Sequence, residues 1–387
     1  MIYIFSTGLS VAFAIISELL RTSYKQTCKN KARLQRTLKL HTLQNVFDNK
    51  YNAISTRFSI KYFISALFAV FSAIPLIVIS AFRYKVGTDF PIYWIMYKQK
   101  GLKSGRGVEP GYTFLVRILR CFTSDPQVFF VVTSIIVCGI YFYVMYKESD
   151  CFPVSVFLFV ATREYFRQMN GIRQYLAVAF LLIALVYLRK EKWLSVAVFT
   201  AVACSFHYSA LIIVLFIVLC RINLKPLYLL LGSFVSLVLA RLFKSLLYPI
   251  VNRFTDFGGY FESSSRYSDS HFEKLTFLSY IVLMIVSIIV FKQSDETDAH
   301  DYVYYTNGVF LGLVFYALSA TFPTVITRFG WYSNIFVTLY FPNVMKMIKN
   351  QAIRWAAYPS LLAFLGLWSA ILIQRGNQSV LPYMFAH

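Results

Sequence analysis

Charged residues are scarce in this sequence, and acidic residues are the scarcest of them. Only 14% of the 387 residues are Asp, Glu, Lys or Arg, and 17 acidic residues stand against 38 basic ones. Hydrophobic residues make up 58% of the chain and the mean hydropathy is +0.59, which lies far outside the balance of a soluble domain. The composition therefore excludes an ordinary soluble fold and indicates a polytopic membrane protein.

Three kinds of pattern are also missing. The six cysteines show no paired spacing, no carboxylate cluster of the D-x-D type is evident, and long β-barrel alternation is absent. The first absence argues against a disulfide framework or a cysteine-bound metal, and the second against a divalent ion held by acids. The third leaves helices as the spanning elements. We therefore expect an all-α membrane protein with no metal and no cofactor.

The formal net charge of +21 does not indicate nucleic acid binding, because Lys and Arg lie at the ends of apolar runs rather than in a soluble basic domain. Residues 21–61 carry ten basic residues and a single acid, Asp48. The positive-inside rule makes this basic segment cytoplasmic. Anionic lipids are its expected partners.

Apolar runs recur along the whole chain, and a bilayer crossing needs roughly 20 helical residues. The number and length of the apolar runs predict a single membrane domain over residues 1–387 with about 12 transmembrane or re-entrant helices. Two extended outer loops are expected, at 83–126 and 248–274. The run at 193–220 has a polar stretch at its middle, and charge favours two short helices over one long crossing there. The first run, 1–20, is expected to stay a helix, because no Lys or Arg precedes it as in a signal peptide.

A polar stretch, TREYFRQMNGIRQYL, interrupts the apolar runs at residues 162–176. Arg163 and Arg167 share one helical face, and Arg173 lies at the expected start of the next apolar helix. An arginine beside a helix N-terminus suits an anion such as phosphate. The predicted topology brings further polar residues to the same outer level. These are Arg83, Asp89, Glu109, His207 and Arg328.

Snorkelling to lipid headgroups is the alternative explanation for any one of these arginines. Snorkelling arginines should be commoner on the cytoplasmic side, however, so the collective outer placement favours a binding site.

Short motifs occur in a fixed order along these outer segments. They are Val-Gly-Thr-Asp at 86–89 after Arg83, Glu-Pro-Gly-Tyr at 109–112, Gly-Ile-Arg-Gln with Ala177 at 171–177, Phe206-His207 followed by Ser209-Ala210, and Arg328 followed by Tyr332. In this order the set resembles EpsG-type proteins, relatives of the Wzy polysaccharide polymerases. The resemblance covers residues from about 82 to about 340. Phe90-Pro91 departs from the commoner continuation of the first motif, and the basic insertion after the first span looks long.

The resemblance implies a bacterial inner-membrane glycosyltransferase of the GT-C-like class, which works without a metal. It implies an inverting polymerase of oligosaccharide repeat units carried on undecaprenyl pyrophosphate, acting in exopolysaccharide, capsule or O-antigen synthesis. Donor and acceptor are then both lipid-linked, and the active site faces the periplasm or the cell exterior. A chain-length regulator and a flippase are further partners that it suggests.

The leaving pyrophosphate needs cationic stabilisation, and an arginine fork can hold two phosphate oxygens. Arg173 and Arg328 are the first candidates for this role, and Arg163, Arg167 and Arg83 come next. Glu164 is most simply the partner of its neighbour Arg163.

The acceptor hydroxyl must lose a proton, and His207, Asp89 and Glu109 are the candidate bases. His207 has an equally good structural interpretation, as a polar group satisfying a broken helix pair. Asp89 and Glu109 are expected to orient arginines or bind sugar hydroxyls rather than act as the base. The candidate sugar ligands are Gln174, Tyr112 and Tyr332.

Other functions stay open at this point. A ligase that moves a completed glycan uses much the same groups. A flippase or exporter of the same lipid also needs internal arginines, but alternating access usually rests on repeated halves, which the sequence lacks. A membrane acyltransferase with His207 as base expects a second polar partner near the histidine.

Overall fold

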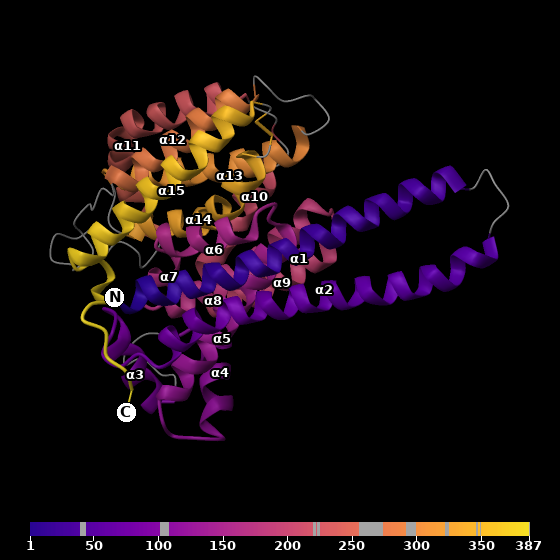
Figure 1. The fold of residues 1–387 in the computed structure, drawn as a ribbon. Coiled ribbons are helices and arrows are strands. Elements are labelled where there is room, and N and C mark those ends of the chain that lie inside the picture. Colours follow the sequence, from indigo (N-terminus) through magenta and orange to yellow (C-terminus); the bar gives the residue numbers. More distant parts are fainter. Residues whose placement is uncertain are drawn as a thin grey trace.

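The structure is a computed structural model. It describes the whole chain except residues 39–43, 101–107, 220–221, 223–224, 255–273, 292–298, 322–324, 346, 349 and 387. Figure 1 shows a bundle of helices from which the first two project together as a long hairpin, while both chain termini lie at the other end.

The described residues form helices joined by turns. In chain order they are α1 (Ile2–Leu38), α2 (Gln44–Ala81), α3 (Phe90–Lys98), α4 (Pro110–Arg120), α5 (Gln127–Glu148), α6 (Phe152–Ala161), α7 (Glu164–Arg167), α8 (Ile172–Arg189), α9 (Trp193–Phe206), the 3₁₀ helix η1 (Tyr208–Ile212), α10 (Ile213–Leu219), α11 (Pro226–Phe254), α12 (Lys274–Phe291), α13 (Ala299–Leu318), α14 (Val325–Met345), α15 (Gln351–Gln374) and the 3₁₀ helix η4 (Asn377–Ser379).

Within the described residues, five helices are long and apolar enough to cross a membrane. They are α5, α8, α15, the Ile2–Gln26 part of α1 and the Ile60–Ala81 part of α2. Shorter apolar helices of 10–17 residues make up much of the remainder. The all-helical membrane architecture is thereby confirmed, whereas the number of crossings and the GT-C-like class stay predictions.

One end of the bundle gathers the segments predicted to lie outside, and we name it the outer end after that prediction. The hydroxyl of Tyr3 donates to the carbonyl of Val380 at 2.9 Å. The backbone N–H groups of Tyr84 and Gly87 donate to the carbonyls of Met384 and Ser379, each at 2.9 Å. The C-terminal segment therefore binds the start of α1 and the turn that follows α2.

The opposite end gathers the segments predicted to be cytoplasmic. Arg21 donates to the carbonyls of Tyr146 and Ser149. Glu148 pairs with Arg189 at 2.5 Å and with Lys190 at 2.9 Å. Helix ends that the predicted topology assigns to the same side of the membrane thus lie together at the same end of the bundle. Which end of the bundle faces the cytoplasm stays a prediction.

The 193–220 run is the expected pair of short helices. α9 ends where His207 takes an extended backbone, with φ −160°, and η1 and α10 follow. Asn307 on α13 donates to the carbonyls of Leu219 and Ile222 at 2.7 and 3.0 Å. Tyr304, on the same helix, donates to the carbonyl of Leu185, so α10 returns toward the end where α8 finishes.

Two predicted segments differ in detail from their expected form. Residues 21–61 continue α1 and α2 as unbroken helix on both sides of residues 39–43 (Figure 1). α11 runs to Phe254, so the first seven residues of the predicted loop 248–274 are helical, and 255–273 lie outside the described residues. The first outer loop, 83–126, holds α3 and the amphipathic α4, which buries Tyr112 and Val116 and exposes Phe114.

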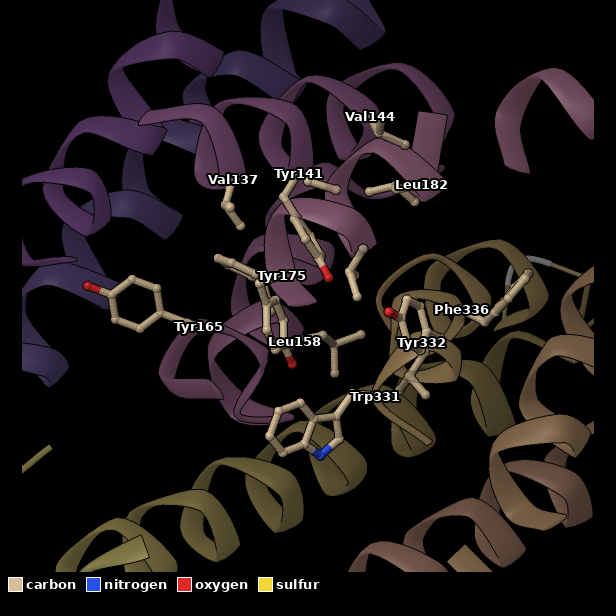
Figure 2. Packing of buried hydrophobic residues seen from close by; sticks show 14 of the residues in the cluster. Val137, Tyr141, Val144, Leu158, Tyr165, Tyr175, Leu182, Trp331, Tyr332 and Phe336 are labelled. Atoms are coloured by element: carbon tan, nitrogen blue, oxygen red, sulfur yellow. The ribbon is translucent and has the colours of Figure 1, made fainter. Parts of the chain in front are cut away.

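The core at the centre of the bundle is aromatic. Figure 2 shows Tyr141 of α5, Leu158 of α6, Tyr175 of α8 and the neighbouring pair Trp331 and Tyr332 of α14 in one packed group. All are at most 8% exposed. Aromatic side chains bury large areas, and here the hydroxyls of Tyr175 and Tyr332 point to polar partners of the site described next.

Candidate active site

Glu109 joins two other residues predicted to belong to the site. Its Oε2 lies 2.5 Å from Nη1 of Arg173, and its Oε1 lies 2.6 Å from Nδ1 of His207. The Glu109 side chain is 8% exposed, whereas those of Arg173 and His207 are 23% and 28% exposed. The three residues, named here the Glu109 triad, therefore lie just below an accessible surface.

The Glu109 carboxylate is held in its charged form. Burial raises the pKa of Glu109, but the hydrogen bond with His207 and the charge of Arg173 more than offset it and lower the pKa below its usual value. An ionised carboxylate only accepts hydrogen bonds. Nδ1 of His207 must therefore carry a proton, which leaves Nε2 as the acceptor nitrogen when the ring is neutral.

A close helix contact brings Glu109 to His207. Glu109 is the N-cap of α4, and Pro110 takes the first helical position, which its fixed φ suits. A Cβ on Gly111 would lie 2.3 Å from Oγ and 2.8 Å from the carbonyl oxygen of Ser205. Only glycine allows α4 to approach the end of α9 so closely.

Arg173 occupies the first turn of α8. Its backbone N–H donates to the hydroxyl of Tyr93 at 3.3 Å, and its guanidinium lies 5.7 Å from the ring centre of Tyr112, within cation–π range. Its Nε is buried without a hydrogen-bond partner among the described residues. Arg173 is thus oriented by Glu109 and two tyrosines and keeps a donor that nothing in the described chain satisfies.

The start of α14 lies directly beside this turn. The side-chain amide of Gln174 donates to the carbonyl of Arg328 at 2.7 Å, and the Arg328 guanidinium lies 5.6 Å from the ring centre of Trp331. The hydroxyl of Tyr332 lies 2.7 Å from Oγ of Ser209. Four separate parts of the chain thus bring five of the residues predicted for the site into one region. These residues are Glu109, Arg173, Gln174, His207 and Arg328.

Tyr112 and Tyr332 are buried. They are 0% and 1% exposed, so neither ring offers a face on which a sugar can stack. Tyr112 lies under Arg173, and Tyr332 supports Ser209. Their positions favour a structural role over the sugar contact expected from the sequence.

Asp89 reaches the triad indirectly. It caps α3, and its carbonyl accepts from the N–H of Tyr93, the residue whose hydroxyl meets Arg173. Its own N–H lies 3.4 Å from Oδ1 of Asn170. Gly87, two residues before Asp89, has φ +100°, and a Cβ there would lie 2.6 Å from the same oxygen, so the turn needs glycine.

Arg83 is enclosed by protein. It donates to the carbonyl of Ser80 and, at 3.0 Å, to that of Met169, and its guanidinium lies 4.8 Å from the ring centre of Phe130. At 1% exposure, burial lowers the pKa of Arg83 to about 10. This environment ties the end of α2 to the 162–171 turn and favours a structural role over phosphate binding.

Glu164 pairs with Arg167 at 2.8 Å, which corrects the expectation that its immediate neighbour Arg163 is its partner. On a helix, residues three apart face each other and adjacent residues do not. Glu164 also accepts from the hydroxyl of Tyr175 at 2.9 Å and the amide of Asn334 at 2.7 Å. Both members of the pair are essentially fully buried, so the pair is part of the core.

Arg163 points elsewhere. Its backbone is left-handed, with φ +69°, and its guanidinium donates to Oγ1 of Thr276 at 2.7 Å and to Oδ1 of Asn377 at 3.3 Å. It lines a small cavity together with Thr276 and Trp368, and it belongs neither to the Glu109 triad nor to the Glu164–Arg167 pair.

Sequence reasoning missed Trp331. Its ring centre lies 5.6 Å from the guanidinium of Arg328 and 5.9 Å from that of Arg167, so it connects the triad region to the buried pair. The only sequence signal was its position three residues after Arg328, on the same helical face. Across the described chain, no three or more His, Cys, Asp or Glu side chains gather in a way that would hold a metal ion.

Comparison with known protein families identifies the family to which this chain belongs. The model of the EpsG family matches residues 66–385, a range that contains the whole triad. The chain belongs to the EpsG family. The resemblance inferred from the ordered motifs is therefore confirmed, and it indicates a multi-pass membrane protein of polysaccharide polymerase type. The basic segment 21–61 precedes the EpsG match. Comparisons with curated proteins and with solved structures gave no match.

Proposed function

We propose that this EpsG-family protein is an inverting membrane glycosyltransferase that polymerises oligosaccharide repeat units carried on undecaprenyl pyrophosphate. The observation that carries the proposal is the bridge from Glu109 to both Arg173 and His207. Glycosyl transfer from a pyrophosphate requires a cation for the leaving group and a base for the acceptor hydroxyl. One buried carboxylate orients both.

His207 is the proposed general base. With Nδ1–H bonded to Glu109, Nε2 accepts the proton of the acceptor hydroxyl, and the carboxylate stabilises the imidazolium that forms. Among the three candidate bases this assigns Glu109 to orientation. Asp89, one turn before Tyr93, is proposed to orient the acceptor or bind a sugar hydroxyl.

Arg173 and Arg328 are the proposed pyrophosphate ligands. As the acceptor oxygen bonds to the anomeric carbon, the bond from that carbon to the pyrophosphate oxygen breaks, and negative charge grows on the leaving group. Arginine stays protonated in a low-dielectric site and presents several donors. After the transfer the proton is bound to His207, where the Glu109 carboxylate compensates the positive charge of the imidazolium. The negative charge of the leaving pyrophosphate is compensated by Arg173 and Arg328.

The arginines give the direct test. Arg173→Ala and Arg328→Ala are expected to abolish polymer formation by the purified protein while membrane insertion and yield stay normal. Arg117→Ala is the control, because Arg117 is an exposed arginine of the same outer loop and its loss should leave the product unchanged. Wild-type chain lengths from both test variants would overturn the assignment.

Two other functions make different predictions. A flippase or exporter of the same lipid would not elongate repeat units in detergent, which provides no two sides, so elongation there excludes pure transport. An acyltransferase expects a polar partner beside His207, and Glu109 meets that expectation. The same carboxylate also holds a cation, however, which favours a phosphate leaving group. A ligase differs only in its acceptor, so product length in the same assay separates it from a polymerase.

A further inference from the structure

The C-terminal segment that follows α15 contacts a residue close to the candidate site. The side-chain amide of Asn170 donates to Oε1 of Gln378 at 2.6 Å and to the main-chain carbonyl of the same residue at 3.0 Å. Asn170 precedes Arg173 by three residues and lies beside Asp89. The last part of the chain thus touches the turn from which the proposed pyrophosphate ligand follows.

The Asn170 side chain makes every hydrogen bond that a primary amide can make. Its Oδ1 lies 3.1 Å from the hydroxyl of Thr88 and 3.4 Å from the backbone N–H of Asp89, and its Nδ2 donates to the two oxygens of Gln378. An amide has two acceptor lone pairs and two donor hydrogens, and Asn170 is only 3% exposed. Gln378 therefore supplies half of the bonds that orient a buried amide.

A ring of contacts leads from Asn170 to Arg173. The carbonyl of Asp89 accepts from the N–H of Tyr93 at 3.2 Å, and the hydroxyl of Tyr93 accepts from the N–H of Arg173 at 3.3 Å. The chain itself closes the ring, because Asn170 and Arg173 flank Gly171, the N-cap of α8. A shift of the Asn170 amide therefore changes the position of the first turn of α8 relative to Tyr93.

The backbone of Gln378 is left-handed, with φ +69° and ψ 0°. This region is uncommon for residues other than glycine, and holding a glutamine there costs free energy. Glycine would adopt the same conformation without that cost. Backbone strain of this kind gathers at functional sites, so the Gln378 side chain is a candidate for a role that glycine could not fill.

We infer that Gln378 is a positioning residue, which holds Arg173 in place for the leaving pyrophosphate by fixing the Asn170 amide. The inference rests on the proposed function, because Arg173 is a pyrophosphate ligand only in that mechanism. If Gln378 served stability alone, turnover per folded molecule would not change on its replacement. A positioning role predicts that turnover falls even where stability is kept.

Gln378→Gly separates the two roles. It removes the Oε1 acceptor but relieves the left-handed backbone, and these effects on stability oppose each other. The melting temperature in detergent should therefore stay close to that of wild type. The kcat for elongation of lipid-linked repeats, normalised to folded protein, should fall about 10-fold with KM changed less than about threefold, because Arg173 acts on charge that develops in the transition state.

Two matched variants complete the comparison. Gln378→Glu keeps both the acceptor oxygen and the backbone conformation, so its kcat should stay within about threefold of wild type. Glu191→Gly is the control for the backbone change, because Glu191 is exposed and left-handed, with φ +55°, in the turn between α8 and α9 at the opposite end. Its kcat should equal that of wild type.

Pyrophosphate binding tests the positioning without turnover. Inorganic pyrophosphate, which resembles the leaving group, is titrated into the purified protein and followed by isothermal titration calorimetry. Arg173→Ala defines the part of the affinity that depends on Arg173. Gln378→Gly should weaken that part about 5-fold, whereas Gln378→Glu should leave it nearly unchanged.

The outcomes distinguish the inference from the function. Unchanged kcat and unchanged pyrophosphate binding in Gln378→Gly would overturn the inference, even if Arg173→Ala abolishes polymer formation. Equal losses in Gln378→Glu and Gln378→Gly would also overturn it, because the first variant keeps the acceptor. A loss of turnover that disappears on normalisation to folded protein would leave Gln378 a structural residue only. Weaker pyrophosphate binding in Gln378→Gly, in a protein that forms no polymer, would keep the positioning role and refute the polymerase.

Discussion

Replacing Glu109 with glutamine removes the charge that connects Arg173 to His207 while keeping the size of the side chain. The amide can accept a hydrogen bond with its oxygen, but its nitrogen can only donate. Because Arg173 is also a donor, and His207 must donate from Nδ1 to keep Nε2 free, at least one contact is lost. The expected result is a folded protein whose base and pyrophosphate ligand are no longer aligned.

The structure sets the size of the effect. A hydrogen bond to a charged group contributes about 1.5–3 kcal/mol, so losing one lowers the rate about 10- to 100-fold. The carboxylate also faces the imidazolium that forms in the reaction, and removing its charge adds to that loss. We therefore expect polymerisation by Glu109→Gln to be at least about 100-fold slower than by wild type.

The assay is single-turnover elongation of lipid-linked repeats in detergent, normalised to folded protein. Glu148→Gln is a closely matched control, because Glu148 also bridges two cations and its side chain is also 8% exposed, but at the opposite end. It should lose a similar amount of thermal stability and keep its turnover. Equal turnover in Glu109→Gln and wild type would refute the proposed role of the triad.

The pH dependence of stability gives a second readout of the same substitution. The pKa of Glu109 is lowered in the folded protein, so the stability gained from its charge is fully present above the unfolded value of about 4.3. That contribution disappears as pH falls through the lower folded pKa. The difference in melting temperature between wild type and Glu109→Gln should therefore shrink as pH falls below about 4. A difference that does not change between about pH 5 and about pH 3 would contradict the ion pair.

Three further predictions concern the supports of the site. Gly111→Ala should slow polymerisation about 10-fold or more, because its Cβ would meet Ser205; an unchanged rate would show that the α4–α9 contact is dispensable. Asn170→Ala removes the contacts to Asp89 and Gln378 and should lower the free energy of unfolding by about 1–3 kcal/mol, measured by thermal denaturation in detergent. Tyr332→Phe should cost about 1 kcal/mol of stability with turnover within about threefold, and a much larger loss of turnover would restore the sugar-contact interpretation.

Much of the fold could be predicted from the sequence because its signals are local. Apolar runs bounded by Lys and Arg predict where helices begin and end and which ends lie together. Tyr3 contacts Val380 at the end of the bundle predicted to lie outside, and Arg21 contacts Ser149 at the end predicted to be cytoplasmic. The broken run at His207 was predictable for the same reason, since a polar stretch interrupts an otherwise apolar helix.

The partners of individual charges could not be predicted in this way. Adjacency in sequence paired Glu164 with Arg163, whereas helical geometry pairs it with Arg167. Because all arginine side chains offer the same charge and donors, the sequence ranked Arg83 and Arg163 equally with Arg167 as candidate pyrophosphate ligands. Burial gave Arg83 carbonyl partners, and a left-handed backbone directed Arg163 to a separate cavity.

Sequence alone determined the class of molecule, the family motifs and the short list of polar residues at one membrane level, because hydropathy and charge act locally and can be read along the chain. Only the tertiary structure decided that Glu109 holds Arg173 and His207, which lie 64 and 98 residues away from it. Such contacts depend on how closely α4 approaches α9 and where α8 begins. Those distances are properties of packing, and no stretch of sequence contains them.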